Sequence, residues 1–172
     1  MNITLRLSTQ SIDDAIKQVQ EFRQRFLRHM EELCKRLAEE GMEVMELEYG
    51  RALYAGINDI EVSVDAQGES AYIIAKGERV AFIEFGTGVR YAESPHGAKA
   101  GIPPRGSYGK HKGATGKPWI YKGEPGNLGS KVKGKPGYYW SIGNPAASAI
   151  PAAMIYMQNR IMDIAREVFD DD

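Results

Sequence analysis

Few residues of this chain have the type and spacing that catalytic or metal-binding sites need. His29, His96 and His111 each lack a second ligand at metal-binding spacing, so none of them indicates a zinc site. A phosphate-binding loop requires Ser or Thr after its Gly-Lys pair, but Pro118 follows Gly116-Lys117. The sequence therefore predicts that the protein is not an enzyme and has no catalytic residue, cofactor or metal.

The segment 80–89 combines an apolar run, one acidic residue and two closely spaced glycines. Its β-branched and aromatic residues favour a strand, in which Phe82 and Glu84 would share one face. Gly86 and Gly88 allow a sharp turn with positive φ where this strand ends. We single out Glu84, Phe85, Gly86, Thr87 and Gly88 as a signature corner. The alternative interpretation of these five residues is an ordinary turn from a strand into a loop.

Length and composition indicate one globular domain. The chain has 172 residues, of which 42% are hydrophobic and 26% charged, with a net charge of −1. A single cysteine, Cys34, excludes an internal disulfide. No apolar run is long enough to span a membrane and no secretory leader is visible, so we expect no membrane partner and a protein that stays in the cytoplasm where it is made.

Residues 88–143 differ from the rest of the chain. They carry a net charge of +8 and 13 of the 19 glycines, whereas the remainder carries −9. This composition predicts a long basic loop or insertion, interrupted by two aromatic pieces, 119–122 and 138–142, that form a strand pair or docking anchors. The residues expected to contact partner subunits or DNA are Arg90, Lys99, Arg105, Lys110, Lys112, Lys117, Trp119, Tyr121, Lys122, Lys131, Lys133, Lys135, Tyr138, Tyr139 and Trp140.

Hydrophobic spacing predicts helices at both ends of the chain. Residues 3–7 alternate like an edge strand, and Ser11 with Asp14 has the form of a capping box that opens a long helix over 11–40. Gly41 is the expected stop, and a second, shorter helix ends at Gly56. A closing helix over 149–169 is expected to pack against the sheet.

Three strands, 59–64, 70–76 and 79–85, are expected between these helices as an antiparallel meander, because their connections are short. The fold class is therefore α+β, with a long N-terminal helix and a C-terminal helix packed on a small antiparallel β-meander. We expect one domain over 1–172, from which the Gly/Pro/Lys-rich loop 88–143 projects.

The order of these elements and the Glu-Phe-Gly-Thr corner at 84–87 resemble the neck and tail-completion proteins of long-tailed bacteriophages. The segment 144–154, rich in proline and alanine, stands where members of that family open their last helix. The chain departs from many members because residues 49–54 replace a Pro-x-x-Thr-Gly stretch, which leaves its exact level in the neck or tail open.

This resemblance implies a structural virion protein of the head–tail joint or tail end, of the neck, head-tail connector, tail-completion or tail-terminator type. It further implies a homo-oligomeric ring, hexameric in this family, around the DNA channel, located in the neck or upper tail of the virion after assembly in the host cytoplasm. The implied neighbours are phage head-closure, tail-terminator or tail-tube proteins, with non-specific contact to channel DNA.

An alternative function follows from the basic loop alone. Its lysines could track phosphates while Tyr121, Tyr138, Tyr139 and Trp140 stack on bases, as in a nucleic-acid-binding module. A third, weaker alternative is an enzyme whose site has no recognisable pattern. From the sequence, the loop can face either protein or DNA.

Overall fold

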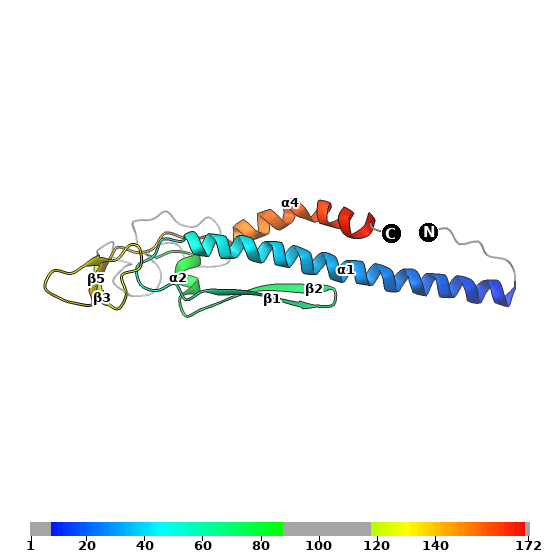
Figure 1. Ribbon diagram of the computed structural model, residues 1–172, viewed down its shortest axis with the longest axis horizontal. Helices are drawn as coiled ribbons and strands as arrows, with labels where there is room; N and C mark the ends of the chain where they lie inside the picture. Colours follow the sequence, from blue (N-terminus) through cyan, green and yellow to red (C-terminus); the bar gives the residue numbers. More distant parts are fainter. Residues whose placement is uncertain (1–7, 88–117, 171–172) are drawn as a thin grey trace.

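The computed structural model describes residues 8–87 and 118–170, and it has the expected α+β fold (Figure 1). One long helix runs through the body, with a hairpin on one side, a second helix on the other and a small sheet at one end. In chain order the elements are α1 (Thr9–Arg51), β1 (Glu61–Gln67), β2 (Ser70–Lys76), α2 (Val80–Glu84), β3 (Trp119–Lys122), β4 (Ser130–Lys131), β5 (Tyr138–Ser141) and α4 (Ala149–Asp170). The edge strand expected at 3–7 lies outside the described residues.

Helix α1 is continuous over 43 residues, so the expected stop at Gly41 and the separate second helix were wrong. The expected capping residue was wrong as well, because Ser8 is the N-cap and its hydroxyl accepts from the Ser11 amide at 3.3 Å. A Cβ at Gly41 would lie 2.7 Å from Ile73 Cδ1 and from Met157 Sδ. Gly41 therefore serves close packing of three elements instead of ending the helix.

Helix α1 lies between α4 and the β1–β2 hairpin and contacts both (Figure 1). Helix α4 begins where sequence spacing placed it, but it packs mainly on α1 and not on the sheet, which corrects that expectation. Two ion pairs join the helices, Arg36 with Glu167 and Arg160 with Glu40. The buried side chains form two hydrophobic clusters. One consists of Met45, Tyr49, Ala52, Ile83, Ala149 and Ala153, and the other of Leu33, Ile164 and Val168.

The third strand expected at 79–85 is instead the short helix α2. Asp59 accepts from the amides of Glu78 at 3.0 Å and Arg79 at 3.3 Å, and these bonds direct the chain into a helical turn. Ile83 and Glu84, which alternate faces in a strand, are both buried. The meander is therefore reduced, within the described residues, to the antiparallel hairpin β1–β2.

Residues 118–143 are not simply a loop, because they contain a three-stranded antiparallel sheet of order β3-β5-β4. The expected pairing of the two aromatic pieces is confirmed: Trp119 lies opposite Ser141, and Lys122 opposite Tyr138. The sheet is fastened to the end of α1 by Asn127, whose Oδ1 accepts from the Tyr54 amide at 2.6 Å.

No helix of the described residues is long and apolar enough to cross a membrane.

Candidate functional site

The signature corner is tied to the start of α4 by the carboxylate of Glu84. Its Oε2 accepts from the Ala149 amide at 2.9 Å and its Oε1 from the Ile150 amide at 3.2 Å. These amides belong to the first turn of α4, where free N–H groups and the helix dipole favour a negative charge. Glu84 is 1% exposed, so its carboxylate serves as an internal cap for a helix 65 residues further along the chain.

Backbone hydrogen bonds complete this junction, which we call the corner clasp: residues 83–87 bound to residues 144–150. The Thr87 amide donates to the Asn144 carbonyl at 2.8 Å, and the Asn144 amide donates back to Thr87 at 3.0 Å. The Ser148 amide donates to the Glu84 carbonyl at 3.1 Å. Two segments far apart in sequence are therefore held in a fixed register by both main chain and side chain.

Gly86 has the positive φ that the sequence indicated, at +73°. A Cβ at this position would lie 2.8 Å from both the Asn144 carbonyl oxygen and the Ala146 amide nitrogen. The corner therefore needs glycine for two reasons, its backbone conformation and the close approach of the second segment. Gly88 lies outside the described residues.

The clasp also reaches helix α1. Asn144, 8% exposed, accepts from the Ala55 amide through Oδ1 at 2.9 Å, just past the end of α1. Tyr49 of α1 is buried beside Glu84, and burial first, with the carboxylate second, raises the pKa of its phenol. Helices α1, α2 and α4 thus meet at one buried polar junction. A carboxylate enclosed in this way is a structural cap, with no exposed face for general acid–base chemistry.

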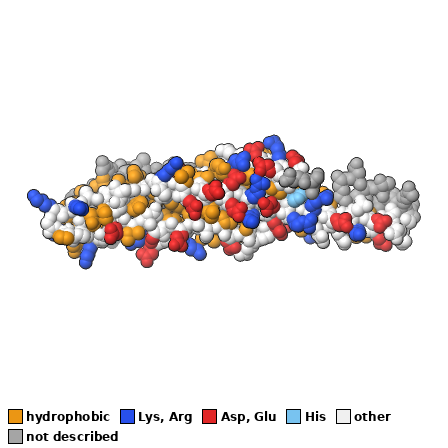
Figure 2. All heavy atoms as spheres, in the orientation of Figure 1, with side chains coloured by type: hydrophobic (Ala, Val, Ile, Leu, Met, Phe, Trp, Pro, Cys, Tyr) orange, Lys and Arg blue, Asp and Glu red, His pale blue; other side chains and the backbone are white. Residues whose placement is uncertain are grey.

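Beside the clasp, an apolar groove of about 680 Å³ runs over α1 between β2 and α4. Its lining includes Leu37, Met45, Ile73, Val80, Ile150 and Met154. Within the described residues β2 pairs only with β1, so its groove-side edge has no partner strand. In Figure 2 hydrophobic side chains are spread over the half of the molecule that carries the strands, while charged side chains gather where α1 and α4 lie together.

The expected aromatic contacts are divided between the two faces of the β3-β5-β4 sheet. Tyr121 and Tyr139 are cross-strand partners with ring centroids 5.9 Å apart, and the Tyr121 hydroxyl donates to the Glu124 carbonyl at 2.9 Å. Tyr138 and Trp140 alternate with Tyr139 along β5 and are 38% and 40% exposed. The four rings therefore do not form one stacking surface.

The expected basic contacts fall partly inside the described residues. Lys122 and Lys131 are exposed on β3 and β4, and Lys133 and Lys135 are exposed in the turn that leads to β5. Trp119 is partly buried on β3. The other six expected contacts, Arg90, Lys99, Arg105, Lys110, Lys112 and Lys117, lie outside the described residues.

Sequence reasoning missed the asparagines that hold the clasp and the small sheet. Asn127 donates through Nδ2 to the Ala52 carbonyl at 3.1 Å, and Asn144 binds the Ala55 amide as described above. Both stand in turn-forming contexts, Pro-Gly-Asn and Asn-Pro, which signal turns but not their distant partners.

Within residues 8–87 and 118–170, no group of three or more His, Cys, Asp or Glu side chains is arranged to hold a metal ion. The chain matches no protein-family model, no curated protein and no solved structure.

Proposed function

We propose that this protein is a structural subunit of the head–tail joint or tail end of a long-tailed bacteriophage, acting in a ring around the DNA channel. The observation that carries the proposal is that the family-like motif Glu84-Phe85-Gly86-Thr87 has a definite architectural role. It fixes α4 to α2 and, through Asn144, to the end of α1.

The exposed apolar surface also supports a protein that works in an assembly. Met154, Ile155, Ile161 and Met162 of α4 are between 42% and 60% exposed, and the groove between α4 and β2 is open. Contiguous apolar surface on a soluble protein marks contact sites for other proteins. Heterologous contacts of such surfaces between identical subunits close into a ring when the rotation permits.

The alternative, a nucleic-acid-binding module, has one observation in its favour. Tyr138 and Trp140 are exposed on one side of β5, and Lys122 is exposed opposite Tyr138 on β3. Two aromatic rings with a neighbouring lysine could stack on bases and contact a phosphate. The pairing of Tyr121 with Tyr139 leaves only half of the expected stacking surface available for this function.

DNA binding separates the two functions. We expect the free protein to bind duplex and single-stranded oligonucleotides weakly in fluorescence anisotropy, because the exposed face of the described sheet offers two aromatic rings with one neighbouring lysine. Trp140→Ala should then leave the titration unchanged. Two results together would instead support the nucleic-acid module. The first is tight binding whose affinity falls by about 0.9 log units per log unit of salt for each phosphate contacted. The second is a loss of about 1–3 kcal/mol of binding free energy in Trp140→Ala.

A further inference from the structure

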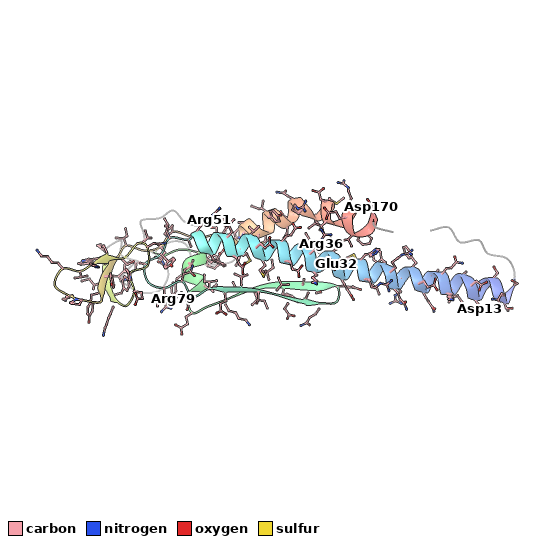
Figure 3. All side chains as sticks on the ribbon, viewed as in Figure 1. Asp13, Glu32, Arg36, Arg51, Arg79 and Asp170 are labelled. Atoms are coloured by element: carbon pink, nitrogen blue, oxygen red, sulfur yellow. The ribbon has the colours of Figure 1, made fainter. Side chains whose placement is uncertain are left out.

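The first part of helix α1, Thr9 to Arg28, extends past the end of α4 and carries an exposed apolar stripe. We call this part the α1 arm. In Figure 3 Asp13 lies near the far end of α1, whereas Asp170, the last residue of α4, lies beside its middle. The stripe consists of Ile12, Ile16, Val19, Phe22 and Phe26, which are between 42% and 51% exposed. Five large apolar side chains on one face of a helix indicate a contact surface.

The stripe continues an interface that already exists within the chain. Further along α1, the same face packs on α4 through Met30, Leu33 and Leu37. The last contact of α4 on this face is Phe169, whose ring centroid lies 5.7 Å from that of Phe26. The α1 arm therefore presents a helix-packing face from which the second helix is missing.

Within residues 8–87 and 118–170, α4 is the helix that packs along this face of α1, and it ends at Asp170. No second helix of these described residues continues along the arm, whose five stripe side chains stay between 42% and 51% exposed.

The spacing of the stripe is symmetric about its central residue. Ile12 and Phe26 are seven residues from Val19, and Ile16 and Phe22 are three residues from it. An antiparallel copy of the same helix therefore places Val19 against Val19, Ile16 against Phe22 and Ile12 against Phe26. Such self-complementarity is the property of an isologous, two-fold contact.

Charge selects the antiparallel direction. Asp13 and Asp14 stand at the beginning of the stripe, and Arg23, Arg25 and Arg28 stand at its other end. Antiparallel arms bring the acidic end of one copy to the basic end of the other, whereas parallel arms bring like charges together. The partner arm would also run in the direction of α4, which is antiparallel to α1 (Figure 1).

We propose that the α1 arm is a homodimerisation element that pairs antiparallel with the arm of a second copy, with the two-fold axis at Val19. The paired arms bury the five stripe residues of each copy and align opposite charges at both ends. This pairing concerns the free chain and does not rest on the proposed ring.

The first test compares the wild-type chain with Val19→Asp by sedimentation equilibrium. The variant places a carboxylate against its own copy at the centre of the stripe, so we expect the dissociation constant of the dimer to rise at least tenfold. Gln24→Asp adds the same charge at an exposed position outside the stripe. It is the control and should raise the dissociation constant far less than Val19→Asp, because its carboxylate is not enclosed by the paired arms. Circular dichroism checks that both variants keep their helix content.

The second test uses cysteine cross-linking, which does not depend on the stability of Val19→Asp. In a Cys34→Ser background, Val19→Cys should form a disulfide-linked dimer under mild oxidation. Ile12→Cys should not, since antiparallel pairing separates the two copies of residue 12 by 14 residues, about 21 Å of helix. A wild-type chain that stays monomeric, or equal cross-linking at residues 12 and 19, would overturn the proposal.

Discussion

At the scale of single residues, the buried Glu84 carboxylate explains why an acidic residue stands in an otherwise apolar segment. It is fully enclosed and receives two amide hydrogen bonds from the first turn of α4. A buried carboxylate without such donors would cost several kcal/mol of stability, whereas at a helix N-terminus it is matched to unpaired amides and to the dipole. The motif is thus explained by packing between distant segments.

Replacing Glu84 by Gln tests this role. Gln keeps one acceptor but turns an NH₂ group toward amides that also donate, so we expect the free energy of unfolding in urea to fall by about 1–3 kcal/mol. Glu78→Gln, in the neighbouring turn with a side chain that is 86% exposed, should change it by less than about 0.5 kcal/mol. An unaffected Glu84→Gln protein would mean that the cap contributes nothing.

Gly86 and Gly134 form a matched pair for separating backbone strain from steric conflict. Their φ angles are +73° and +74°, but only at Gly86 would a Cβ meet backbone atoms, at 2.8 Å. We therefore expect Gly134→Ala to cost about 1 kcal/mol and Gly86→Ala clearly more, because the clasp must also open. Melting temperatures of the two variants check this order; equal losses would contradict the close approach.

The contrast between Gly86 and Glu84 shows what the sequence could reveal about the clasp. Positive φ at Gly86 follows from local composition, since two glycines after an apolar run indicate a sharp turn. The role of Glu84 depends on Ala149 and Ile150, which no local pattern connects with it. For the same reason the helical state of 80–84 was not predictable, because Asp59, 20 residues before Arg79, induces it.

At the scale of elements, tertiary packing overrides local signals in α1. A glycine after a long amphipathic run normally ends a helix, but Gly41 lies where Ile73 of β2 and Met157 of α4 both come within 2.7 Å of the position that a Cβ would take. Packing with β2 and α4 stabilises the helix beyond this residue by more than the roughly 1 kcal/mol that glycine costs in a helix interior. The closing helix, which has no such conflict, was predicted correctly over its length.

The α1–α4 contact should depend on acid pH through Glu40. The hydrogen bond from Arg160, and then that from Tyr156, lower the pKa of this carboxyl below its ordinary value of 4.5. A lowered folded-state pKa stabilises the protein above about pH 4.5, and this contribution is lost as the pH falls through the folded-state value.

Urea unfolding from pH 7 downward measures this contribution. Glu40→Gln should be less stable than wild type at pH 7 and should lose less stability on acidification. Glu39→Gln is the control, because the side chain of Glu39 is 48% exposed and its pairing with Lys35 is long, at 3.9 Å. Parallel pH profiles for wild type and Glu40→Gln would show that the Arg160 contact does not stabilise the folded state.

At the scale of the whole molecule, the chain is elongated and its surfaces are distributed along its length (Figure 1). The β3-β5-β4 sheet lies at one end, the α1 arm at the other, and the groove between α4 and β2 lies along the body. An extended subunit with apolar contact surfaces suits assembly with copies of itself better than an isolated existence. The α+β class was predictable from hydrophobic spacing, whereas this arrangement was not, because it depends on which elements pack on α1.

Native mass spectrometry over a range of concentrations shows whether the subunits close into a ring. We expect a discrete closed species of six copies of the 19.1-kDa chain, the number that the resemblance to the neck and tail-completion proteins implies. If paired arms join two rings, the species contains twice that number of copies. Val19→Asp should remove the double species and keep the single ring, so that failure of the arm pairing is distinguishable from failure of the ring. A Val19→Asp protein that remains monomeric at every concentration, or forms a ladder of open oligomers without a closed species, would contradict the account.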